Sequence, residues 1–130
     1  MRQRIHSVGV DKKHFQIVKE GMERVSTFGT GRYAHIPGIA LCGKTGTVEN
    51  NHGKDHSLYI GFAPKDDPKI AVAVVVENAG FGATWAAPIA SLLIEQYLTG
   101  KIERTWMLEH ILNTVLNHYE IGRASCRERV

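Results

Sequence analysis

Apolar residues near the start of the chain recur at steps of three and four, the spacing of one face of an α-helix. This spacing predicts a helix over residues 11–25, with Asp11 as its N-cap. Its predicted buried stripe consists of Phe15, Val18, Met22 and Val25. We expect this stripe to pack against a sheet formed by the residues that follow.

Two further helices are predicted in the second half of the chain. The first covers residues 84–98, with Pro88 in its first turns and Gly100 as its stop. Its predicted buried stripe is Trp85, Ile89, Leu92, Leu93 and Tyr97. Thr105 can cap the last helix, which we interpret as packing on the sheet. The apolar face of this last helix is Leu108, Ile111, Leu112, Val115, Leu116 and Tyr119.

Three strands are predicted between these helices, over residues 39–47, 56–63 and 69–77. The second alternates between apolar and polar residues, and the third is rich in β-branched residues. Short polar loops join the strands, whereas parallel strands need crossovers of about a dozen residues or more. The prediction is therefore an α+β fold in which helices cover a three-stranded antiparallel sheet.

The composition narrows the function only slightly. A chain of 130 residues suits one domain or part of a larger one, and its formal net charge is +3. The last ten residues hold three Arg and one Glu, so they supply +2 of that charge and the rest of the chain +1. We therefore expect no nucleic-acid partner. No apolar run approaches the roughly 20 residues that span a bilayer, and no targeting segment is visible.

The stretch GIALCGKTGT, residues 38–47, fits two motifs. One is the phosphate loop G-x-x-x-x-G-K-[ST], which needs a helix that begins at its Lys-Thr pair. The other is the tripeptide K-T-G. The residues after Lys44 and Thr45 read GTVENNHGKD, and their Gly and Asn residues disfavour a helix. This context favours a strand, and with it the second motif.

On a strand edge, the K-T-G residues can form an anion site. The Lys44 ammonium and the hydroxyls of Thr45 and Thr47 can bind one anionic group together. Gly46 has no side chain, so a substrate can lie against the backbone there. We expect no metal site, because His52 and His56 have only Asp55 beside them and three or four ligands are usual.

At these motifs the chain resembles the transpeptidase domain of class B penicillin-binding proteins, most of all the rod-elongation type, penicillin-binding protein 2. The segments that carry the resemblance are VKEGMERV, GTGR, GKTGT, LYIGFAP and IAVAVVVENAGFGATWAAPIA. The resemblance covers residues 1–120 and implies the C-terminal part of that domain. Serine β-lactamases share this fold, but the extension over residues 100–120 disfavours them.

The resemblance implies a D,D-transpeptidase that cross-links cell-wall stem peptides through an acyl-serine intermediate. It also implies that β-lactams bind the enzyme by trapping this serine. It implies that Lys44 sets the positive field of the cleft and that the Thr47 backbone N–H is one of two oxyanion donors. Thr45 and Thr47, with Gly46 between them, would bind the terminal carboxylate of the substrate. It implies no cofactor.

The rest of the catalytic machinery is missing from this sequence. No serine is followed by Lys three residues later or by Asn two residues later, so the S-x-x-K and S-x-N motifs are absent. We expect the complete protein to be the enzyme and this chain alone to be inactive. Cys42 is interpreted as a packed residue rather than a second nucleophile.

Three further expectations concern the partners of the protein, its last ten residues and an alternative function. The partners implied are the stem peptide, β-lactams and other cell-wall elongation proteins, at the periplasmic face of a bacterial inner membrane. Residues 121–130 resemble the translation of a sequencing adapter, so we expect a non-native tail there. The alternative function is a non-catalytic piece that packs or binds a partner, for example through Trp106 and the last helix.

Overall fold

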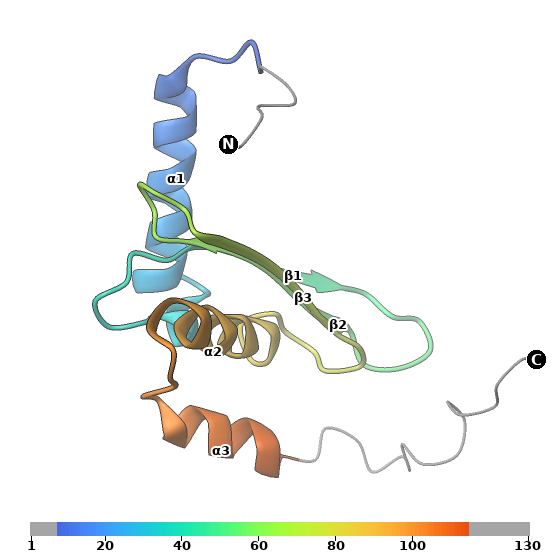
Figure 1. Ribbon diagram of the computed structural model, residues 1–130. Coiled ribbons are helices and arrows are strands. Elements are labelled where there is room, and N and C mark those ends of the chain that lie inside the picture. The colour runs from blue at the N-terminus through green and yellow to red at the C-terminus, as the bar shows by residue number, and fades with distance from the viewer. Residues whose placement is uncertain (1–7, 115–130) are drawn as a thin grey trace, which may run out of the picture.

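A computed structural model describes residues 8–114 of the chain. Its elements in order are α1 (Lys12–Thr27), η1 (Arg32–Ala34), β1 (Cys42–Val48), β2 (His56–Ala63), β3 (Ile70–Val76), α2 (Ala86–Thr99) and α3 (Thr105–Asn113) (Figure 1). The predicted α+β fold is confirmed, and the short 3-10 helix η1 is an addition to it. Residues 115–120 of the predicted last helix and the tail 121–130 lie outside the described residues.

The sheet has the order β1-β2-β3, and both pairs of neighbours are antiparallel. β2 has the predicted bounds, whereas β1 begins at Cys42 rather than at Ile39. Ile39 pairs only with Ile36 in an isolated bridge, and the Ala40 carbonyl accepts a hydrogen bond from the Lys65 amide at 2.8 Å. The chain before Cys42 is therefore bonded to other segments and does not extend the ladder with β2.

Helix α2 covers one face of the sheet (Figure 1). It does so through small residues, Ala86, Ala87 and Ala90, together with Ile94, which join Tyr59 in the core. The predicted stripe was wrong for Leu93 and Tyr97, whose side chains are 53% and 63% exposed. The alanines let the helix backbone lie close to the strands, so the large residues point elsewhere.

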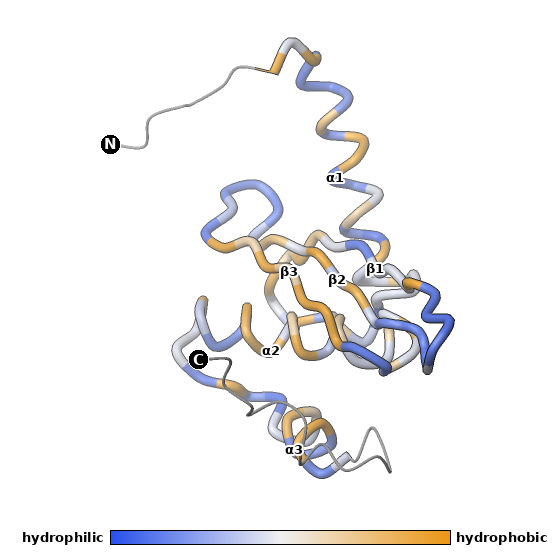
Figure 2. Tube along the Cα trace, turned by 90° about the vertical axis from the view of Figure 1, so that its right-hand side faces the viewer, coloured by the Kyte–Doolittle hydropathy of each residue, from blue (hydrophilic) through white to orange (hydrophobic). Residues whose placement is uncertain are grey.

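The opposite face of the sheet is open among the described residues, and Ile60 and Val75 are exposed on it. Helix α1 contacts β1 from about its midpoint, at Lys19, to its C-terminal end, and its N-terminal part extends beyond the sheet (Figures 1 and 2). The predicted burial of Phe15 and Val18 was therefore wrong, since both are exposed. The predicted N-cap is confirmed, because Asp11 accepts a hydrogen bond from the Lys13 amide.

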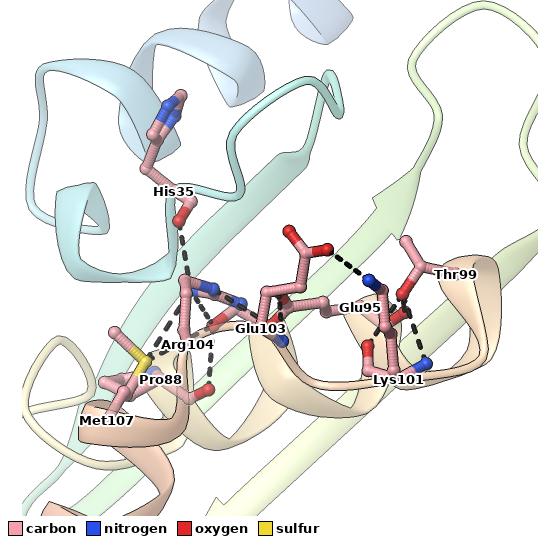
Figure 3. A network of polar contacts seen from close by, with 9 residues as sticks. His35, Pro88, Glu95, Thr99, Lys101, Glu103, Arg104 and Met107 are labelled. Atoms are coloured by element: carbon pink, nitrogen blue, oxygen red, sulfur yellow. Dashed lines mark hydrogen bonds and ion pairs between the residues drawn. The ribbon is translucent and has the colours of Figure 1, made fainter.

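Over the described residues, helix α3 packs mainly on α2 rather than on the sheet, which corrects the predicted packing. Figure 3 shows the polar network that joins the two helices. Its centre is the buried ion pair between Arg104 Nε and Glu95 Oε2, 3.0 Å apart. Arg104 also donates to the His35 carbonyl and to Ser91 Oγ. Leu112, on the predicted apolar face, is exposed, whereas Met107 is buried.

Candidate functional site

All four predicted site residues, Lys44, Thr45, Gly46 and Thr47, lie in β1. No helix begins at Lys44, so a phosphate loop is excluded. β1 is an edge strand among the described strands, so backbone N–H and C=O groups along its free edge have no strand partner. An extended ligand can reach the motif from that edge.

Side chains leave a strand alternately on its two faces, and this divides the motif. Thr45 lies in register with the core residue Tyr59, so the two threonines belong to the face that α2 covers. Lys44 and Gly46 belong to the open face. The two sets of groups can share one anion only if it lies along the free edge, where both faces meet.

Lys44 carries an uncompensated charge in the part of the chain that the structure describes. Its Nζ donates to the Thr45 carbonyl oxygen at 2.5 Å, and no carboxylate among residues 8–114 lies within ion-pair distance of it. The side chain is exposed. A free ammonium beside a strand edge favours an anionic ligand there.

A close contact that the sequence did not predict holds the Thr45 hydroxyl. Thr45 Oγ1 lies 2.9 Å from Thr30 Oγ1, in the turn that follows α1. In the sequence, Thr30 belongs to the segment GTGR, which points only to the family resemblance. Hydroxyl pairs of this kind join distant segments, and no local pattern signals them.

The first glycine of GKTGT has a packing role. A Cβ on Gly43 would lie 1.8 Å from Tyr59 Oη, and one on Gly61 would lie 2.7 Å from Tyr59 Cε1. The Tyr59 ring thus crosses both glycines, and its hydroxyl lies 3.2 Å from Ser26 Oγ in α1. Burial raises the pKa of the Tyr59 phenol. Gly43 therefore allows a buried contact between β2 and α1, directly beside Lys44.

A second glycine supports the motif from the α2 side. A Cβ on Gly82 would lie 2.3 Å from the carbonyl oxygens of Gly46 and Leu58, so the loop before α2 touches the backbone of β1 and β2. Ser57 holds this loop in place, because its hydroxyl donates a hydrogen bond to the Phe81 carbonyl at 3.0 Å. No local sequence pattern predicts this contact between the loop and the sheet.

The two histidines that were weighed as a metal pair lie near the far end of β1. His56 Nδ1 accepts a hydrogen bond from the Asn78 amide at 3.0 Å, so this nitrogen has a structural partner. His52 is exposed in the β1–β2 loop. His56 therefore helps to hold the structure at the start of β2, whereas His52 is exposed to solvent.

Cys42 is buried, and its thiol donates to the Lys19 carbonyl oxygen at 3.4 Å. Burial raises the pKa of the thiol, and the nearby Glu23 carboxylate raises it further. A thiol held in its protonated form is a poor nucleophile. The geometry supports the interpretation of Cys42 as a packing residue.

A hollow of about 600 Å³ lies near α3, far along the chain from the motif. Its lining residues are Tyr33, Thr84, Pro88, Trp106, Met107, His110 and Ile111. The lining residue His110 stacks on Trp85, with ring centroids 6.0 Å apart. The hollow is mostly apolar and holds no charged pair, so β1 remains the candidate site for chemistry.

Comparisons with known proteins place these features in context. The family model for the penicillin binding protein transpeptidase domain matches residues 2–95. A relative in Mycobacterium tuberculosis, peptidoglycan D,D-transpeptidase PbpA, is 44% identical over 75 residues, which are 51% of this chain and 15% of that protein.

Two solved structures are similar in fold and sequence. The imipenem acyl-enzyme complex of penicillin-binding protein A from M. tuberculosis is 38% identical with a TM-score of 0.60, over 69% of this chain and 20% of that one. Pseudomonas aeruginosa PBP2 in complex with WCK 5153 is 34% identical with a TM-score of 0.63, over 77% and 23%. The chain thus spans about a fifth of these structures. Among residues 8–114, no helix has the length and apolar character needed to cross a membrane.

Proposed function

The chain belongs to the penicillin-binding protein transpeptidase family, and from that premise we propose that it supplies the substrate-carboxylate strand of a peptidoglycan D,D-transpeptidase. In this proposal Thr45 and Thr47 bind the terminal carboxylate of the donor peptide or of a β-lactam. Lys44 provides the positive field, and the Thr47 amide is one of two oxyanion donors. The attacking serine, its lysine and the second oxyanion donor come from the remainder of the complete protein.

One observation carries the proposal. The K-T-G-T residues lie on an edge strand, with two hydroxyl residues on one face and, on the other, an ammonium at Lys44 that has no carboxylate partner among residues 8–114. A carboxylate along the free edge would receive charge-assisted hydrogen bonds from both sides. The acyl-enzyme complex of the similar M. tuberculosis protein supports β-lactam acylation in the complete protein.

The proposal extends to the setting of the complete protein. We place it in the rod-elongation type of the family, at the periplasmic face of a bacterial inner membrane and together with other cell-wall elongation proteins. Labelling of isolated membranes with a fluorescent penicillin tests this placement. A labelled band that stays in the soluble fraction would contradict it.

The site is tested by the second-order rate constant of acylation, measured on the complete protein with one penicillin. Lys44→Ala removes one charge-assisted interaction, worth about 1.5–3 kcal/mol, so acylation slows roughly ten- to a hundred-fold. Thr45→Val removes the hydroxyl and keeps the β-branched shape, so it slows acylation without unfolding the strand. Thr45→Ser keeps most of the rate because it keeps the hydroxyl.

The matched controls lie in the adjacent β1–β2 loop. Lys54→Ala deletes the same charge from an exposed side chain, and His52→Ala removes an exposed ring. Both variants acylate at nearly the parental rate. If Lys44→Ala acylates at the parental rate while it melts normally, β1 is not a carboxylate site.

A further inference from the structure

Thr30 sits in a turn that is fixed closely against the end of α1. A Cβ on Gly29 would lie 2.9 Å from Val25 Cα, and one on Gly31 would lie 3.1 Å from Val25 Cγ1. The Gly29 amide donates to the Arg24 carbonyl, and the Gly31 amide donates to the Val25 carbonyl, both at 2.9 Å. Glycines on both sides let the turn lie against the helix, so the backbone of Thr30 has a defined position.

From this position Thr30 reaches the motif. Its Oγ1 lies 2.9 Å from Thr45 Oγ1, and within residues 8–114 Thr45 is the only side chain to which the Thr30 hydroxyl is bonded. Each hydroxyl has one proton and two acceptor lone pairs, so only one of the two can donate in this contact. The direction of the bond decides what Thr45 can offer a ligand.

A carboxylate ligand selects one direction. It only accepts hydrogen bonds, so it binds Thr45 best when the Thr45 proton points at the ligand. Thr45 Oγ1 then accepts the proton of Thr30, and the chain Thr30–Thr45–carboxylate has every donor matched to an acceptor. Hydrogen bonds in such a chain polarise one another and strengthen by about 10–30% per bond.

We propose that Thr30 is a positioning residue, which donates to Thr45 Oγ1 and thereby directs the Thr45 proton toward the carboxylate of the substrate. This inference rests on the proposed function and adds a residue from outside the strand. Thr30 fixes the rotation of the Thr45 hydroxyl before the substrate arrives, so less ordering is needed upon binding. Thr30 itself does not touch the reacting atoms.

The test compares a penicillin with its uncharged methyl ester on the complete protein. Thr30→Val keeps the shape of the side chain and removes its proton. Acylation by the acid slows roughly three- to tenfold, the size of a neutral hydrogen bond. With the ester the loss is only about two- to threefold, because hydrogen bonds to charged groups are about twice as strong as those to neutral groups. Thr30→Ser restores the acid rate.

Thr27→Val is the matched control, since the Thr27 hydroxyl donates to the Glu23 carbonyl within α1 at 3.1 Å. For this variant, the ratio of the acylation rate with the acid to the rate with the ester equals that of the parent. If Thr30→Val fails to fold, Thr30→Ala provides the same comparison.

The outcomes separate this inference from the proposed function. Suppose that Lys44→Ala reacts slowly with the acid and that the parent reacts slowly with the ester. If Thr30→Val then reacts like the parent, or slows equally with both compounds, the positioning role is refuted and the carboxylate strand stands. If the parent acylates equally fast with acid and ester and Lys44→Ala has no effect, both the proposed function and this inference are overturned.

Discussion

Replacement of Gly43 by alanine tests how the motif is built into the fold. The added Cβ would lie 1.8 Å from Tyr59 Oη, 2.3 Å from Cζ and 2.8 Å from Cε2. Carbon atoms in van der Waals contact are about 3.5–4.0 Å apart, so the Tyr59 ring has to move. Tyr59 is 1% exposed and packs in the core beneath α2, which leaves it little room.

Two contributions to the free energy of unfolding set the size of the effect. Insertion of a methyl group into a packed core costs about 1–3 kcal/mol, because neighbours are forced off their preferred positions. A displaced Tyr59 ring also loses its buried hydrogen bond to Ser26, which is worth about 0.5–1.5 kcal/mol. Gly43→Ala should therefore lower the free energy of unfolding by about 2–4 kcal/mol.

The assay is urea unfolding of the complete protein, followed by the fraction that a fluorescent penicillin still labels. With a urea dependence of about 2 kcal/mol/M, the midpoint for Gly43→Ala falls by about 1–2 M. Gly21→Ala is the matched control, because Gly21 lies inside α1 with no atom within 4 Å of its added Cβ. Alanine is the better helix former there, so this variant gains up to about 1 kcal/mol.

Two results would refute the contact between Tyr59 and Gly43 as the cause of this effect. An unchanged midpoint for Gly43→Ala would show that Tyr59 does not cross the glycine. In a Tyr59→Leu background the clashing ring atoms are gone, so Gly43→Ala should cost little. If it costs as much there as in the parent, the cause is not the contact described above.

This chain expressed alone should not be acylated by a fluorescent penicillin, because none of its serines stands in an S-x-x-K motif; an adduct in its mass spectrum, on Cys42 for example, would contradict this. Glu95→Ala should destabilise the docking of α3 by about 3–5 kcal/mol, because it leaves the buried Arg104 charge unpaired, and limited proteolysis near Arg104 should detect this; resistance equal to the parent's would count against it. Burial raises the pKa of Cys42 above its ordinary 9.0 and that of Tyr59 above 10.0, so the folded state holds these protons longer than the unfolded state; stability is full below about pH 9 and falls as the pH rises beyond it, and a flat profile in alkaline urea unfolding would be inconsistent with that burial.

The sequence was sufficient for the order and direction of the strands. β2 was predicted with both bounds because its alternating residues match the period of a strand, and the short polar loops required antiparallel neighbours. The strand position of Lys44 to Thr47 was also predicted, since the residues around them disfavour a helix, and their role as a binding site stays a prediction.

The sequence failed where distance in space decided the outcome. The buried face of α2 consists of alanines such as Ala90, which a search for large apolar residues passes over. Phe15 was predicted to be buried because periodicity cannot show that the sheet ends halfway along α1. The contacts that support the motif, Thr30 with Thr45 and Gly82 with Gly46, join segments 15 and 36 residues apart, and no local pattern encodes them.

A crystal structure of the complete protein acylated by a penicillin would show whether β1 binds the carboxylate of the substrate along its free edge. We expect the carboxylate of the bound penicillin at about 2.7–3.2 Å from the hydroxyls of Thr45 and Thr47, with the Lys44 ammonium beside it. A carboxylate held by other residues, with no contact to β1, would refute this binding mode.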